Sequence, residues 1–151
     1  MKQLILISSF LLYSIIGFSQ PSNDNCENAL PVTINVDLNC SSFVSGTLLG
    51  ATASPQSQAS CSGSEDDDVW FSFVATNSTH YIELSNIVGN TTSLVHSVWT
   101  GTCPSLTLYS NSCSYSSLSA VHGLTIGTTY FIRVYSSITG GAPNTTFDVC
   151  I

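Results

Sequence analysis

Four consecutive acids, Glu65, Asp66, Asp67 and Asp68, form the densest charge in the 151-residue chain. Adjacent carboxylates repel one another unless a cation lies between them, and Ca²⁺ accepts six to eight oxygen ligands. The run is therefore a candidate calcium site. The alternative is a solvated acidic loop in which one aspartate bonds to a turn. Because neither EF-hand spacing nor a Gly-rich nonapeptide repeat accompanies the acids, we expect no cofactor.

Arg133 is the cation for which these acids compete. The chain has only two basic residues, Lys2 and Arg133, against nine acids, and its formal net charge is −7. Asp68 directly precedes an aromatic strand, and we predict that it forms an ion pair with Arg133. A chain with so few cations cannot neutralise several phosphates, so its composition excludes nucleic acid and anionic membrane surfaces as partners.

Catalytic constellations are missing from the sequence. Its three histidines, His80, His96 and His122, are scattered and form no H-E-x-x-H motif. Serines are abundant, but no G-x-S-x-G elbow and no recognisable base with its orienting acid accompany them. The acids outside the run show no pairing suited to glycosidic hydrolysis. We therefore predict that the protein is not an enzyme.

Four aromatic side chains are candidate ligand contacts: Trp70, Trp99, Phe131 and Tyr135. Flat rings outside the core could stack on sugar rings, while oxygens of the acidic run bond the hydroxyls. Because strand residues alternate between faces, both faces of these strands carry aromatics, which is more than a solvated face needs. The alternative is that a loop or a second layer covers the rings.

The elements that must position these residues are predicted to be short strands. β-branched and aromatic runs alternate with Gly, Asn, Ser and Pro, and helical periodicity is missing. We predict strands at 32–36, 47–51, 69–75, 81–84, 94–99, 106–109, 118–121, 128–135 and 146–151. About nine short strands indicate an all-β, jelly-roll-like sandwich of two sheets. The long connection 52–68 is of the kind that is functional or disordered.

The first nineteen residues have the three parts of a secretory signal. Lys2 precedes an apolar stretch, and small residues follow at 17 and 19. The stretch is too short to span a bilayer, which needs about twenty residues. We therefore predict a signal peptide at 1–19, one domain at 20–151 with no membrane span, and a secreted or extracytoplasmic location.

All six cysteines follow this segment, and an even number in an exported chain predicts three disulfides. Six cysteines allow fifteen pairings. We predict Cys26–Cys150, which would tie the two ends of the domain, Cys40–Cys61, and Cys103–Cys113, which would close a hairpin.

Gly127 and Tyr130 stand at the spacing of a tyrosine corner, in which the hydroxyl bonds back to the preceding turn.

Several stretches together resemble the β-sandwich modules of secreted and surface proteins of the Bacteroidetes, which are related to the bacterial pre-peptidase C-terminal domain. They are N-D-N-C at 23–26, D-D-D-V-W-F-S-F-V-A at 66–75, V-W-T-G-T-C at 98–103, L-T-L at 106–108 and G-T-T-Y-F-I-R-V at 127–134. The resemblance implies a non-catalytic module that accompanies proteases or adhesins. After Cys113, where related modules often carry acids, this chain has S-Y-S-S, which argues against a calcium site.

We therefore expect a free-standing structural, adhesion or protein-interaction module of the bacterial envelope or exterior. The alternative function is binding of a carbohydrate or surface polymer by the exposed aromatics and the acidic loop. Its partner would be a protein or a glycan at the cell surface.

Overall fold

Runs of β-branched and aromatic residues form nine strands in the computed structural model, which describes residues 19–56, 61–140 and 143–151. The predicted signal peptide lies outside the described residues except for residue 19. The elements are a 3₁₀ helix η1 (Cys26–Asn28) and strands β1 (Leu30–Pro31), β2 (Val44–Thr47), β3 (Val69–Val74), β4 (Thr79–Val88), β5 (Leu94–Thr102), β6 (Ser105–Leu108), β7 (Leu118–His122), β8 (Thr129–Ser136) and β9 (Thr146–Cys150). No described helix is long and apolar enough to cross a membrane.

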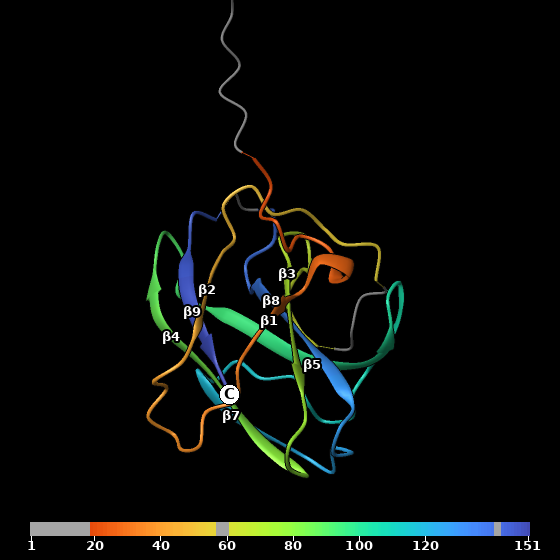
Figure 1. Ribbon diagram of the computed structural model, residues 1–151. Coiled ribbons are helices and arrows are strands. Elements are labelled where there is room, and N and C mark those ends of the chain that lie inside the picture. Colours follow the sequence, from red (N-terminus) through yellow and green to blue (C-terminus); the bar gives the residue numbers. More distant parts are fainter. Residues whose placement is uncertain (1–18, 57–60, 141–142) are drawn as a thin grey trace, which may run out of the picture.

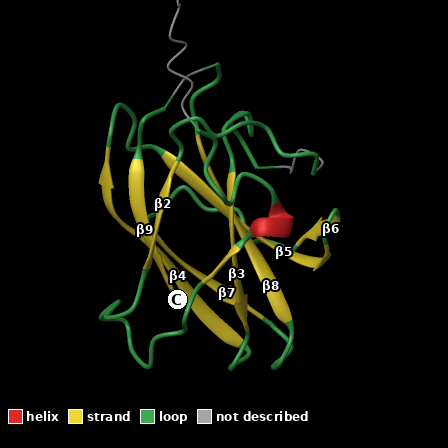
Figure 2. Cartoon of the chain, turned by 45° about the horizontal axis from the view of Figure 1, so that its top comes forward, coloured by secondary structure: helices red, strands yellow, loops and turns green. Residues whose placement is uncertain are grey.

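The strands form two sheets that face each other, so the predicted all-β sandwich is confirmed (Figures 1 and 2). One sheet has the order β1-β3-β8-β5-β6 and the other the order β2-β9-β4-β7. Every pair is antiparallel except β1 with β3, which is parallel.

The first two predicted strands are misplaced. The predicted strand 47–51 is largely a turn, because Gly50 has a positive φ of 77° and the Ala51 N–H bonds the Leu48 carbonyl at 3.0 Å. The predicted strand 32–36 lies beyond β1, which ends at Pro31. There the side chain of Asn35 organises a loop instead.

Strand alternation places the core between the sheets, as β8 illustrates. Tyr130, Ile132 and Val134 lie in the main core, whereas Arg133 points to the opposite face. The tyrosine corner is also confirmed, since the Tyr130 hydroxyl accepts the Thr125 N–H at 3.0 Å.

The three disulfides correct our predicted pairing. The bonds are Cys26–Cys103, Cys40–Cys150 and Cys61–Cys113, with Cα–Cα distances of 6.0, 5.7 and 5.6 Å that suit a disulfide. The predicted pairs Cys26–Cys150, Cys40–Cys61 and Cys103–Cys113 are wrong. Two of these pairs joined cysteines that are close in sequence. The third assumed that the two ends of the domain lie together.

Long-range topology explains the observed bonds. Cys103 lies in the tight turn between β5 and β6, where it meets η1. Cys150 ends β9 beside the loop that carries Cys40, because the Ile151 carbonyl accepts the N–H of Asn35. The bonds close 52 to 110 residues of chain, and loop-closure entropy of that length corresponds to about 4–5 kcal/mol for one disulfide.

His96 is a buried ionisable group between the sheets. Its Nε2 lies 2.6 Å from the Ser119 hydroxyl, and its Nδ1 has no hydrogen-bond partner among the described residues. Burial lowers the pKa of His96 from 6.5 to about 4. A histidine with a lower pKa in the folded state contributes stability at neutral pH. That stability is lost as the pH falls from about 6.5 towards about 4, because the unfolded chain binds the proton first.

We therefore predict that the wild type loses about 2–3 kcal/mol more stability than His96→Gln between about pH 7.5 and about pH 4.5. Urea unfolding at the two pH values measures the difference. The exposed His122→Gln is the control and should behave as the wild type does. Equal acid sensitivity of His96→Gln and wild type would contradict the prediction.

Candidate functional site

The aromatic residues predicted to contact a ligand do not form an exposed platform. Trp70 and Tyr135 are 0% exposed, Trp99 is 1% exposed, and Phe131 is partly buried against the same cluster. They lie on the outer face of the five-stranded sheet, where η1 and the described parts of segment 52–68 cover them. The prediction of sugar stacking is therefore wrong for Trp70, Trp99 and Tyr135, for which the alternative of a covering loop holds. For the partly buried Phe131 it stays a prediction.

Arg133 is the centre of this buried cluster. Its guanidinium carbon lies 5.3 Å from the Trp70 ring centroid and 5.6 Å from that of Trp99. The two indoles meet edge to face, with centroids 5.8 Å apart. An electron-rich ring face attracts a cation, so both rings contribute to holding the guanidinium.

Two carboxylates neutralise the guanidinium. Nη1 lies 2.7 Å from Glu65 Oε2, and Nε lies 2.8 Å from Asp68 Oδ2. The predicted ion pair with Asp68 is confirmed, and Glu65 is a second partner that the sequence did not indicate. Because Asp68 also accepts the N–H of Ser54 at 2.8 Å and the Trp70 Nε1–H at 2.9 Å, the cluster fastens the covering loop to the sheet.

The other two acids of the run contact different donors. Asp67 accepts the backbone N–H and the hydroxyl of Ser136, and burial raises its pKa. Asp66 is partly exposed and accepts the N–H of Gly140 at 3.0 Å. The four acids therefore have protein partners in three separate places.

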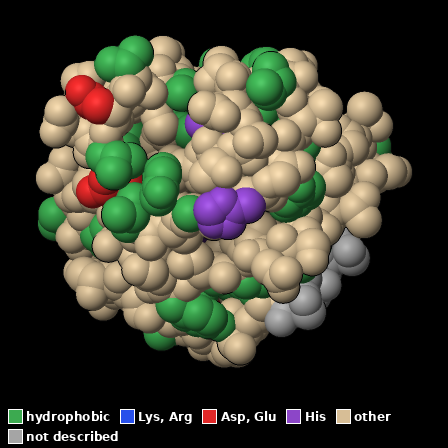
Figure 3. Space-filling model, turned by 90° about the horizontal axis from the view of Figure 1, so that it is seen from below, with side chains coloured by type: hydrophobic (Ala, Val, Ile, Leu, Met, Phe, Trp, Pro, Cys, Tyr) green, Lys and Arg blue, Asp and Glu red, His purple; other side chains and the backbone are tan. Residues whose placement is uncertain are grey.

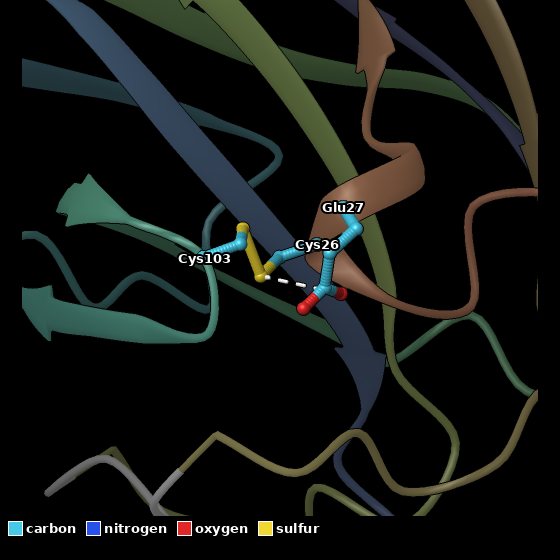
Figure 4. Close-up of side chains that lie close together, drawn as sticks. All are labelled: Cys26, Glu27 and Cys103. Carbon is cyan, nitrogen blue, oxygen red and sulfur yellow. Dashed lines mark hydrogen bonds between the residues drawn. A yellow bond between two sulfur atoms is a disulfide. The ribbon is translucent and has the colours of Figure 1, made fainter.

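Two described groups bring three potential metal-ligating side chains within 4.8 Å of one another. They are Cys26 with Glu27 and Cys103, shown in Figure 4, and Cys40 with Glu83 and Cys150. In both groups the two sulfurs are bonded to each other. Since a metal binds the thiolate form of cysteine, these groups are carboxylates beside disulfides and not metal centres.

A cleft lies at the lower end of the sandwich, away from this cluster. Its volume is about 600 Å³, and one wall is the loop at 34–38, next to Ile151. This loop and the C-terminus lie together in Figure 1. Seen from below, hydrophobic side chains gather around acidic ones at this end, with histidine beside them (Figure 3).

The loop wall is held rigidly. The Asn35 side-chain amide donates to the carbonyls of Ser42, at 2.8 Å, and Ile151, at 3.1 Å, and its oxygen accepts the Ser42 N–H at 2.8 Å. The Cys40–Cys150 disulfide joins the same loop to β9. Despite this anchoring, Val36 is fully exposed and Leu38 is 62% exposed. Apolar side chains on an ordered, exposed loop are a typical feature of a contact surface.

The opposite wall is the turn at 76–78 and the start of β4. His80 is buried there, and its Nε2 accepts the N–H groups of Thr76 and Asn77, each at 3.1 Å. Burial lowers the pKa of His80, which favours the neutral ring that these two donors require.

Tyr81 points outward from β4 and is 45% exposed. Its cross-strand neighbour is Ala120, a side chain too small to cover the ring.

Sequence reasoning did not find this cleft. The only local signal was the pair Val36 and Leu38 on either side of Asp37. Because Val36 was assigned to the predicted strand 32–36, the pair was not recognised as part of an exposed loop. The other wall begins about forty residues later in the chain, at Thr76.

Residues 22–149 match a family described as galactose-binding-domain-like and associated with type IX secretion. No curated protein matches the chain. The match supports a β-sandwich module of the Bacteroidetes, as the resemblance implied, whereas the relation to the pre-peptidase C-terminal domain stays a prediction. Modules of this family are typically non-catalytic, and the association with type IX secretion indicates a secreted or extracytoplasmic protein.

The buried cluster predicts a large effect of Arg133→Met. This substitution leaves Glu65 and Asp68 buried without a cation, so unfolding free energy should fall by about 3–5 kcal/mol. The neighbouring Asp66→Asn is the control and should change it by under about 0.5 kcal/mol. Denaturant unfolding measures both. Neutralising Glu65 and Asp68 as well, with Gln and Asn, should recover most of the loss. A stable Arg133→Met single variant would show that the cluster is not a stabilising unit.

The contacts of the acidic run also bear on calcium. Because Glu65 and Asp68 bond Arg133 and Asp67 bonds Ser136, we predict that calcium leaves the melting temperature unchanged. An ion bound at a hundredfold excess over its Kd would stabilise the fold by about 2.7 kcal/mol and raise the melting temperature by several degrees. A calcium-dependent rise that disappears in Asp66→Asn/Asp67→Asn would contradict this prediction.

Proposed function

The chain belongs to the galactose-binding-domain-like family, and from that premise we propose that it is a non-catalytic adhesion module that binds surface carbohydrate in the cleft between loop 34–38 and β4. The observation that carries the proposal is the half-exposed ring of Tyr81 beside polar groups in a cleft with a fixed wall. The family description adds the ligand class as support.

The chemistry of the cleft suits a sugar. A pyranose ring offers an apolar face that an aromatic ring can cover, and a rim of hydroxyls that need hydrogen-bond partners. Tyr81 supplies the ring, while the carboxylate of Asp37 and the amide of Asn77 supply polar groups in the same cleft. Asp37 is held in orientation because its Oδ1 accepts the Asn39 N–H at 3.0 Å.

Rigidity is the second support. Ordering a loop during binding costs about 0.5–1.5 kcal/mol for each side chain that is immobilised. Asn35 and the Cys40–Cys150 disulfide order this loop before any ligand arrives. A module that binds single sugars weakly gains most from such preorganisation.

A protein partner is the second candidate function. It is favoured by Val36 and Leu38, because two exposed aliphatic side chains two residues apart suit a protein surface better than a sugar. This partner would contact the same loop, because Val36 and Leu38 both line the cleft.

Glycan-array binding, followed by calorimetry on the best ligand, tests the proposal. We predict that Tyr81→Ala weakens glycan binding by about tenfold or more, which corresponds to about 1.4 kcal/mol. The matched control is Tyr115→Ala, an exposed tyrosine that does not line the cleft. Absence of glycan binding by the wild type, on the array and in calorimetry, would overturn the carbohydrate proposal and leave the protein partner as the candidate.

A further inference from the structure

We infer that the ligand of this cleft is a glycan carrying free amino groups, an amino-sugar polymer whose ammonium groups are recognised by Asp37, Glu83 and the ring of Tyr81. The inference rests on the proposed function and adds the chemical class of the sugar. It follows from the burial of Arg133 and from the positions of two acids, Asp37 in the cleft and Glu83 near Tyr81 on β4.

The described surface offers no basic side chain of lysine or arginine. Arg133 is 1% exposed and bonded to two carboxylates, and Lys2 lies outside the described residues, in the predicted signal peptide. The lower face in Figure 3 accordingly shows acidic side chains and no lysine or arginine. A glycan with carboxylate, sulfate or phosphate groups would therefore meet repulsion and no compensating ion pair.

The histidine of the cleft does not change this balance. Nε2 of His80 accepts two backbone N–H groups, so the ring is held in its neutral form. The cleft keeps its negative character while that pair of hydrogen bonds persists.

Two acids are placed to receive a cation near Tyr81: Asp37 lines the cleft, whereas Glu83 lies beside the cleft on β4 and is not part of its lining. Asp37 is exposed on the loop wall of the cleft. Glu83 is two residues beyond Tyr81 on β4, so both side chains project from the same face, about 7 Å apart along the strand. The Glu83 carboxylate also lies 3.2 Å from Cys40 Sγ, next to the anchored loop.

An ammonium group uses all three of these features. A tyrosine ring attracts a cation over its face, and a carboxylate within a few ångströms adds a charge-assisted hydrogen bond. A neutral N-acetylated or plain hexose gains the ring contact and ordinary hydrogen bonds, but neither the cation–π attraction nor the charge-assisted bond. The net charge of −7 further increases the rate of encounter with a cationic polymer at low salt.

Calorimetry with three soluble oligosaccharides tests the inference: a glucosamine tetramer, an N-acetylglucosamine tetramer and a galacturonate tetramer. The pH is set so that the sugar amines are protonated. We expect the glucosamine tetramer to bind at least about tenfold more tightly than the N-acetylated one. Its affinity should fall several-fold between about 20 mM and about 300 mM salt, because exposed charges are then screened. The galacturonate tetramer should not bind.

The matched pair of variants is Asp37→Asn and Asp66→Asn. Both remove one exposed or partly exposed acid, and only Asp37 lines the cleft. Asn at 37 keeps an oxygen for the Asn39 N–H, so an unchanged melting temperature is expected. Asp37→Asn should weaken glucosamine binding several-fold, and Asp66→Asn should leave it unchanged.

The remaining outcomes separate the two claims. Salt-independent binding of the N-acetylated tetramer, as tight as that of the amino form, would overturn this inference and leave carbohydrate binding in place. Equal weakening by the two variants would show that overall charge, and not the cleft, attracts the ligand, which also overturns it. Failure of all three sugars, and of the neutral glycans on the array, would refute the proposed function itself.

Discussion

The burial of one guanidinium governs the arrangement of this protein. Removing Arg133 from water is costly unless partners of opposite charge are buried with it, and Glu65 and Asp68 must therefore come from the loop to the sheet. Once they do, the loop covers Trp70 and Trp99. The outer face of the five-stranded sheet then becomes a second, smaller core. The cleft between the ordered loop and β4 contains none of the residues of this second core.

Local patterns in the sequence were sufficient for much of the fold. Period-two alternation accounts for the division of β8 between the main core and the face that carries Arg133, because a strand has only two sides. Tyr130 also formed its corner, since that contact spans five residues. Alternation cannot say what lies against a face, however. The aromatics of the outer face were taken as exposed, and only the contacts of a distant loop show that they are buried.

The disulfide pairing and the cleft could not be predicted from the sequence either, because both depend on contacts between segments that are far apart in the chain. Cys40 meets Cys150 across 110 residues because β9 returns beside the loop that Asn35 folds. The spacing of the cysteines does not predict that β9 lies beside this loop. The cleft likewise joins a loop near residue 36 to the start of β4, and each wall looks ordinary by itself. By contrast, the ion pair of Arg133 with Asp68 was predictable, because a lone cation among acids has few alternatives.

The Cys40–Cys150 bond also decides how the domain carries mechanical load. A pull applied to the chain before Cys26 and after Cys150 runs from the first segment to Cys40, crosses the disulfide, and leaves at Cys150. The strands between those cysteines, β2 to β9, lie outside this covalent path and bear no tension. Only the short stretch that leads to Cys40 can be drawn out, by at most about 3.6 Å per residue. A domain tethered in flowing medium would therefore lengthen slightly, with loss of β1 alone from the five-stranded sheet, and its other eight strands would stay paired.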